Sequence, residues 1–254
     1  DLFRSQEDLD SYLSKVDMTH IAANWNTGDL KYEDINHDGK VNNGTNTIGN
    51  HGDLSVIGND QPHYQYTING GVSYKGFDFS MLWRGVAKKD MYFYRGSNIY
   101  WGFMGGWWES CLTPEHLDYF RDQPGSKYSG LYEGDANINT DAYWPRPYLN
   151  NTEEAKNKNH ANTRYLQNAA YLRLQNVQLG YSFPRSITSK MHLEKLRIYF
   201  SGENLLTFSK LPSGIDPVAP VGFPTGGEFF GTAGSGRLTY GADRIYSIGL
   251  TVTY

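Results

Sequence analysis

The last eleven residues of the chain, 244–254, alternate between apolar and polar or small side chains. One set of alternate positions is apolar: Tyr246, Ile248, Leu250, Val252 and Tyr254. The positions between them are small or polar: Ser247, Gly249, Thr251 and Thr253. Because successive side chains of a strand point to opposite faces, this alternation predicts a β-strand with one apolar and one polar face.

Four other stretches have the same two-residue period and predict four more strands. They are residues 64–74, 77–88, 171–183 and 196–208. Their apolar positions are Tyr64, Tyr66, Ile68, Val72, Tyr74, Phe77, Phe79, Met81, Trp83, Val177, Leu179, Tyr181, Phe183, Leu196, Ile198 and Phe200. Lys75 and Gly76 join the first two stretches as a two-residue hairpin turn. The pattern predicts an all-β, antiparallel arrangement, with hairpins at 64–88 and 169–208 and a final strand at 244–254.

The connections between the predicted strands alternate in length. The long ones are residues 1–63, 89–168 and 209–243, and the short ones are residues 75–76 and 184–195. Within the first, we expect a short helix beginning at Ser5 or Gln6 and an Asp- and Asn-rich turn. Antiparallel strands then carry all long connections on one side, as outer-membrane barrels do with their long extracellular loops and short periplasmic turns. By this count the C-terminus lies on the short-turn side.

Two interpretations of these strands are open. In the first they cross a membrane, where a tilted strand needs about 9–11 residues. Five strands do not close a barrel, for which about 8 is the minimum, and lipid does not tolerate open sheet edges, so partner strands must come from elsewhere. In the second the chain is a soluble, calcium-stabilised β-sandwich that binds glycans. The long connection at 89–168 favours the first interpretation, because compact soluble domains seldom carry such a loop.

Composition and motifs exclude several classes of function. The net charge is −4 and no strongly basic patch stands out, so nucleic acid is not an expected partner. The chain has no zinc-binding His motif, nucleophile elbow, Walker loop or dinucleotide fingerprint. Its single cysteine, Cys111, has no catalytic partner motif. We therefore do not expect an enzyme.

The first long connection contains D-I-N-H-D-G at residues 34–39, which matches the beginning of a calcium-binding loop. Oxygen ligands would come from the side chains of Asp34, Asn36 and Asp38 and from the carbonyl of Lys40. The position of the acid that closes such a loop is taken by Thr45. Two alternatives are open: Ca²⁺ bound within residues 34–45, or a turn network in which side chains accept hydrogen bonds from the backbone.

The segment 92–108 contains eight aromatic residues. Flat rings stack on sugar faces or peptide side chains, which makes this segment a candidate ligand-binding loop. Its candidate contacts are Tyr94, Arg95, Trp101, Trp107 and Trp108. Alternatively, the rings anchor the loop at the membrane interface or pack against a partner protein.

Several stretches resemble SusC/RagA-type TonB-dependent outer-membrane transporters of Bacteroidetes, in the order of that family. They are F-R-S-Q-E-D at 3–8, G-D-L-K-Y-E-D-I-N-H-D-G-K at 28–40, V-I-G-N at 56–59, G-V-S-Y-K-G-F-D-F-S at 71–80, Y-L-R-L-Q-N-V-Q-L-G-Y-S-F-P at 171–184 and L-R-I-Y-F-S-G-E-N-L-L-T at 196–207. The terminal aromatic residue, Tyr254, also fits the family, as an assembly signal of outer-membrane proteins.

The resemblance implies that the chain is the C-terminal five-strand segment of a large transmembrane barrel of about 22 strands. In that family a plug fills the barrel, a SusD-like lipoprotein covers the extracellular side and TonB supplies energy. The expected partners are therefore the rest of the barrel and plug, the SusD-like lipoprotein, TonB through the N-terminal part, and outer-membrane lipid. The expected cargo is an oligosaccharide or a peptide. The expected location is the bacterial outer membrane with a periplasmic C-terminus, where the apolar residues of 244–254 face lipid.

Overall fold

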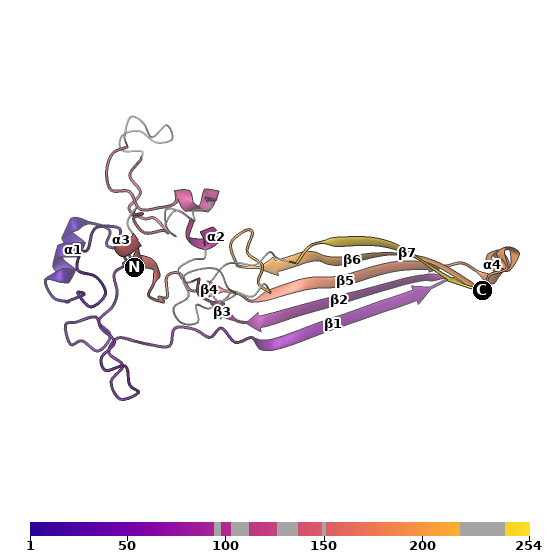
Figure 1. Cartoon of the computed structure of the whole chain (residues 1–254), viewed down its shortest axis with the longest axis horizontal. Helices are drawn as coiled ribbons and strands as arrows, with labels where there is room; N and C mark the ends of the chain where they lie inside the picture. The colour runs from indigo at the N-terminus through magenta and orange to yellow at the C-terminus, as the bar shows by residue number, and fades with distance from the viewer. Residues whose placement is uncertain (94–97, 103–111, 126–136, 149–150, 219–241) are drawn as a thin grey trace. The chain divides into compact units, whose positions relative to one another are not determined.

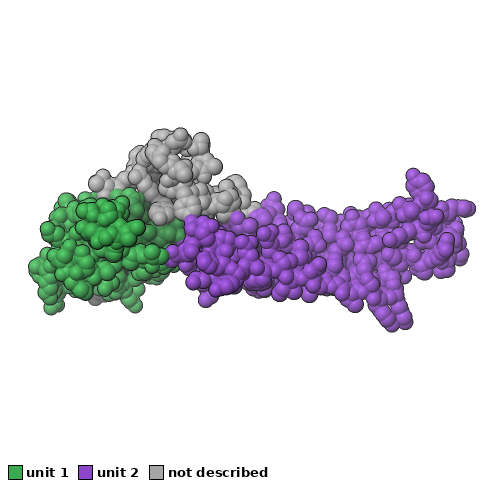
Figure 2. All heavy atoms as spheres, turned by 90° about the horizontal axis from the view of Figure 1, so that it is seen from below, with its two compact units in different colours: residues 1–57, 92–166, 221–238 green, residues 58–91, 167–220, 239–254 purple. Residues whose placement is uncertain are grey.

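The chain forms two compact units in the computed structural model (Figure 2). The structure describes residues 1–93, 98–102, 112–125, 137–148, 151–218 and 242–254. Described residues within 1–57 and 92–166 make up the first unit, and those within 58–91, 167–220 and 239–254 make up the second. In the described part of the chain, no helix is long and apolar enough to cross a membrane.

A five-stranded sheet forms most of the second unit (Figure 1). In spatial order its strands are β1 (His63–Tyr74), β2 (Phe77–Lys88), β5 (Tyr171–Ser182), β6 (Lys195–Ser209) and β7 (Ile245–Thr253). Every neighbouring pair is antiparallel. The two-residue period therefore predicted each strand to within one residue at either end.

Short connections join the strands at one end of the sheet. Lys75 has φ 47° and Gly76 has φ 87°, which confirms the predicted two-residue turn, since a type I′ turn needs positive φ at both positions. Between β5 and β6 the chain makes the helical turns α4 (Arg185–Thr188) and η4 (Ser189–Met191). A separate two-stranded sheet pairs β3 (Asp90–Met91) with β4 (Gln167–Asn168).

The register places the predicted apolar positions of all five strands on one face. One row runs across the whole sheet through directly opposite residues, in the order Val72, Phe79, Leu179, Phe200 and Ile248. A parallel row consists of Tyr74, Phe77, Tyr181, Ile198 and Leu250. Directly opposite residues of a sheet share a face. The five strands therefore form one continuous apolar surface, named the apolar face below, and the other surface is named the polar face.

A register shift between Leu174 and Asn176 interrupts the pairing of β5 with both of its neighbours. Beyond this bulge, Leu174 lies opposite Trp83 on one side and Leu206 on the other. The bulge therefore keeps apolar side chains on the apolar face along the full length of the strands.

The first unit begins with α1 (Gln6–Leu13), whose N-cap is Ser5. The Ser5 hydroxyl oxygen accepts a hydrogen bond from the Asp8 N–H at 3.2 Å, which satisfies one of the free donors at a helix start. The predicted helix start is thus confirmed. Leu9 of α1 packs with Phe3, Met18 and Val41 in a small buried cluster.

Within the long connection 89–168, the described residues of 92–166 form a packed aromatic core. The short helices of this segment are α2 (Asn98–Trp101), η2 (Pro114–Leu117) and α3 (Asn151–Lys158). Tyr100, Trp101, Trp144 and Tyr165 are buried and pack ring against ring, with centroids 5.0–5.8 Å apart. An irregular backbone buries side chains without a regular spacing, so periodicity does not reveal such a core.

Candidate functional site

The apolar face of the sheet is largely exposed. Side chains of the edge strand β7 show this most clearly, with 79% of Ile248 and 63% of Leu250 accessible. Large exposed side chains on the other strands of this face are Ile68, Val72, Tyr74, Phe77, Phe79, Leu179, Ile198, Phe200, Leu206 and Phe208. Soluble monomers rarely expose an apolar patch that extends over five strands, and such patches mark contact with membranes or proteins.

The predicted lipid-facing residues of the final strand lie on this face. Tyr246, Ile248, Leu250 and Val252 are directly opposite Gly202, Phe200, Ile198 and Leu196 of β6. Tyr254 follows the last residue of β7 and is 93% exposed. Their place on the apolar face agrees with the alternation in the sequence, and contact with lipid stays a prediction.

The polar face carries an ion pair that spans three strands. The Arg197 guanidinium on β6 donates to both carboxylate oxygens of Asp78 on β2, with Nε 3.0 Å from Oδ1. Its Nη2 also donates to the Gln178 side chain on β5, at 3.0 Å. Gly180, on the strand between, leaves the space for this pair, since a Cβ built there would lie 2.4 Å from Arg197 Nη2.

A second ion pair anchors the segment that follows β6 to the polar face. Arg173 on β5 donates to Asp216 at 2.6 Å and to the Thr207 hydroxyl at 2.9 Å, and both charged side chains are nearly buried. Asp216 also accepts hydrogen bonds from the Val218 and Ala242 N–H groups. Burial alone would raise the pKa of Asp216, but these hydrogen bonds and the Arg173 charge lower it below its ordinary value.

Of the candidate ligand contacts in the aromatic segment, only Trp101 lies within the described residues. Its indole is fully buried and donates to the Phe93 carbonyl at 2.6 Å. In the described structure Trp101 is therefore a core residue and no surface for a ligand. The candidates Tyr94, Arg95, Trp107 and Trp108 lie outside the described residues, and their roles stay predictions.

The Asp34 loop has the geometry of a turn network. The Asp34 carboxylate accepts hydrogen bonds from the N–H groups of Asp38 and Gly39, and the Asp38 carboxylate accepts one from Lys40 N–H. Asn36 Oδ1 accepts a further bond from the Asp38 N–H at 3.0 Å. Among the described residues, no group of three or more His, Cys, Asp or Glu side chains is placed to hold a metal ion. Calcium at Asp34, Asn36, Asp38 and Lys40 stays a prediction.

Asp53 closes this loop although it lies outside the predicted segment 34–45. Its Oδ1 accepts hydrogen bonds from the N–H groups of Ile35 and Asn36, and its Oδ2 accepts one from Asn42 N–H at 2.8 Å. The spacing between Asp34 and Asp53 follows no calcium-loop template, so the sequence alone does not single this acid out.

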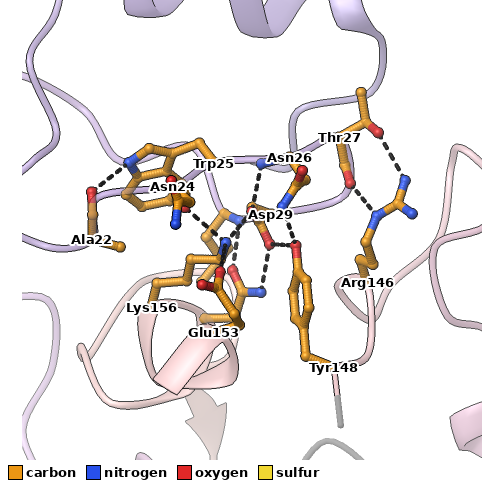
Figure 3. A network of polar contacts seen from close by, with 12 residues as sticks. Ala22, Asn24, Trp25, Asn26, Thr27, Asp29, Arg146, Tyr148, Glu153 and Lys156 are labelled. Atoms are coloured by element: carbon orange, nitrogen blue, oxygen red, sulfur yellow. Dashed lines mark hydrogen bonds and ion pairs between the residues drawn. The ribbon is translucent and has the colours of Figure 1, made fainter. Parts of the chain in front are cut away.

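A buried polar network holds the first unit together (Figure 3). Lys156 Nζ on α3 lies 2.8 Å from Asp29 Oδ2, and both side chains are fully buried. Asp29 Oδ1 accepts hydrogen bonds from the Tyr148 hydroxyl and the Asn157 amide. Burial raises the pKa of Tyr148 and the neighbouring Asp29 charge raises it further, so the phenol remains a hydrogen-bond donor. The segment around Asp29 is thereby fixed to α3.

No family model matches the chain. Two curated proteins of Formosa agariphila are similar to it. TonB-dependent receptor P3 is 30% identical over 171 residues, which cover 66% of this chain and 14% of the receptor. TonB-dependent receptor P26 is 25% identical over 234 residues, which cover 89% of this chain and 20% of the receptor. The chain thus spans a fifth or less of the length of these relatives.

Among solved structures, a RagAB peptide transporter aligns with 73% of this chain and 16% of its own, at 20% identity and a TM-score of 0.44. The RagAB peptide importer in its closed-closed state aligns with 78% of this chain and 18% of its own, at 20% identity and a TM-score of 0.46. The sequence similarity to the two receptors extends through most of the chain. The chain is therefore homologous to a segment of the TonB-dependent receptors.

Proposed function

We propose that the chain forms part of the barrel wall of an outer-membrane, TonB-dependent nutrient importer of the SusC/RagA type. One observation carries the proposal. The five strands present a continuous, exposed apolar face on one side, and the other side holds the ion pairs Asp78–Arg197 and Arg173–Asp216. A membrane barrel strand has the same arrangement, with apolar side chains toward lipid outside and polar side chains toward water inside.

The energetics of the two faces support this orientation. A cationic side chain on a lipid-facing strand costs roughly 2–4 kcal/mol at the middle of the bilayer. The side chains named on the apolar face are uncharged, and the arginines of β5 and β6 lie on the polar face. In this proposal the polar face lines the lumen. The edges of β1 and β7 pair with strands of the same protein, because open edges are not tolerated in lipid.

The connections support an orientation across the membrane. The turn at Lys75 and Gly76 and the turns α4 and η4 lie at the end of the sheet that we place in the periplasm, together with the C-terminus. The segments 1–63, 89–168 and 209–243 then lie outside the cell. They would meet a SusD-like lipoprotein lid, while TonB acts through the N-terminal part of the receptor.

The role that we propose is transport. The cargo would be an oligosaccharide or a peptide that passes along the polar face. The alternative of a soluble β-sandwich fits the geometry less well, because the described strands place no second sheet against the apolar face.

Membrane fractionation of cells that express the full-length protein tests the proposal. We expect the protein in the detergent-extracted outer-membrane fraction, with a mobility in gels that shifts on heating, as barrels unfold only when boiled. Recovery of folded protein in the soluble fraction without detergent would overturn it. A strain lacking TonB should retain the protein in the membrane but lose uptake, which separates membrane placement from transport.

A further inference from the structure

Two arginines lie directly opposite each other on the polar face. Arg84 of β2 pairs with Arg173 of β5 in the register of the sheet. Side chains of directly opposite residues have Cβ atoms about 5 Å apart and share a face, so like charges at such a pair repel. A sheet that keeps this pair needs negative charge nearby to offset the repulsion.

Only one of the two arginines forms an ion pair with an acidic side chain of the described residues. Arg173 is nearly buried and forms its ion pair with Asp216. Arg84 is exposed, and its side chain forms no ion pair or hydrogen bond with any described residue. Arg173 and Arg197, on the same face, each form an ion pair with one carboxylate of the described chain. Arg84 forms no such pair with a described residue.

Apart from Arg173, the neighbours of Arg84 across the adjacent strands are neutral hydrogen-bonding groups, whereas its neighbours along β2 on this face, Leu82 and Val86, are apolar. Arg84 lies opposite Thr67 on β1. On the same face, Leu82 of β2 lies opposite Asn69 on β1 and Asn176 on β5. Val86 of β2 lies opposite Gln65 on β1 and Tyr171 on β5. Glu203 lies opposite Asn176 and is therefore two strands away from β2. Lys88 lies on the same face of β2 and adds a further positive charge.

We propose that Arg84 is a carboxylate-binding position for the cargo, beside the neutralised Arg173, on the lumen face of the barrel wall. The guanidinium fork matches a carboxylate with two parallel hydrogen bonds, and the surrounding amides and hydroxyls bind the polar groups next to it. This inference rests on the proposed function, because it takes the polar face as the wet inner wall. It narrows the cargo to molecules with a free carboxylate, such as a peptide terminus or an acidic sugar.

The test uses the purified full-length protein and two probes of the same shape, 4-fluorobenzoate and the neutral 4-fluorobenzamide, titrated by ¹⁹F NMR. We compare the wild type with R84Q, R84K and K88Q. The K88Q variant is the matched control, because it removes the same charge from the same face of the same strand. We expect R84Q to weaken benzoate binding about tenfold, as for a lost charge-assisted hydrogen bond, and R84K to weaken it less. K88Q should change it little, and benzamide binding should stay equally weak in all four proteins.

Equal effects of R84Q and K88Q, or a wild type that does not prefer the carboxylate, would overturn the inference. Thermal unfolding without ligand tests whether the carboxylate bound by Arg84 belongs to an acidic side chain of the receptor itself. If R84Q lowers the Tm and K88Q does not, Arg84 pairs with an acid of the receptor itself, and the inference is likewise wrong. These readouts are independent of the fractionation test, so a failure of anion binding is distinguishable from a failure of the membrane assignment.

Discussion

Arg197 on β6 reaches across β5 to form a two-pronged ion pair with Asp78 on β2. The pair ties together strands that are not neighbours in the sheet. It is possible because the intervening position is Gly180, whose missing side chain leaves room for both charged groups.

Replacement of Gly180 by alanine should therefore separate Arg197 from Asp78. The added Cβ would lie 2.4 Å from Arg197 Nη2 and 2.7 Å from the Asp78 carboxylate, and these flexible ends would move aside. Both side chains are partly exposed, so we expect a loss of about 1 kcal/mol or less, measured by urea unfolding from lipid vesicles. In a D78A background the same substitution should cost less, and equal costs in both backgrounds would show that the pair contributes nothing.

Leu250 and Thr251 are adjacent residues of β7 on opposite faces. An L250R substitution places a cation on the apolar face and should cost roughly 2–4 kcal/mol if that face meets lipid near mid-bilayer. A T251R substitution places the same charge on the polar face, directly opposite Arg197, where repulsion between the two cations should limit the loss to about 1 kcal/mol. Refolding of the full-length protein into lipid vesicles of defined composition measures both. Similar losses for the two variants would contradict the assignment of faces.

Lys156 and Asp29 are fully buried, so removal of Lys156 leaves the Asp29 carboxylate in the interior without its cationic partner. We expect K156M to destabilise the first unit by about 3–5 kcal/mol, and a D29N/K156M double variant to recover part of the loss. The control is K31M, which breaks the part-exposed pair with Asp8 and should cost at most about 1 kcal/mol. Hydrogen exchange at residues 24–31 and 151–158 reports this local opening, and equal exchange in K156M and K31M would refute the prediction.

His160 packs beside the Tyr32 ring, with centroids 6.0 Å apart, while the residue as a whole stays exposed. Burial lowers the pKa of His160 below 6.5, and the nearby His20 lowers it further. The unfolded chain therefore binds the proton more readily, and the stability of the first unit falls as the pH drops below about 6.5, until the folded pKa is passed. An H160F variant keeps the ring contact and should lack this component. Parallel Tm profiles of the two proteins between pH 5 and 8 would show that His160 has no role.

Asp53 satisfies three backbone N–H groups of the Asp34 loop. A D53A substitution leaves these donors without their acceptor, and we expect a loss of about 1–2 kcal/mol in local stability. Proteolysis of residues 34–53 in the folded protein measures the loss, with H51A as the control in the same exposed stretch. Protection of wild type and D53A by added Ca²⁺, reversed by EDTA, would support the metal alternative.

Much of the second unit could be predicted from local pattern. A strand whose faces meet different surroundings must alternate, so residues such as Ile248 and Phe200 reveal both the strand and its face. Lys75 and Gly76 reveal the turn because few residues adopt positive φ there. The sequence also indicated which residues lie on the polar face. It did not indicate that Arg197 pairs with Asp78 or Arg173 with Asp216, because these ion pairs depend on how neighbouring strands and the following segment align.

The sequence by itself determined the strands, their two faces, the hairpin turn and the start of α1, because each of these depends on residues that are close together in the chain. Only the tertiary structure decided that the described residues within 1–57 and 92–166 belong to one compact unit, that Trp101 is buried within it, and that Asp53 closes the Asp34 loop. These features join residues far apart in the chain through an irregular backbone, which imposes no repeating spacing on the side chains that it buries.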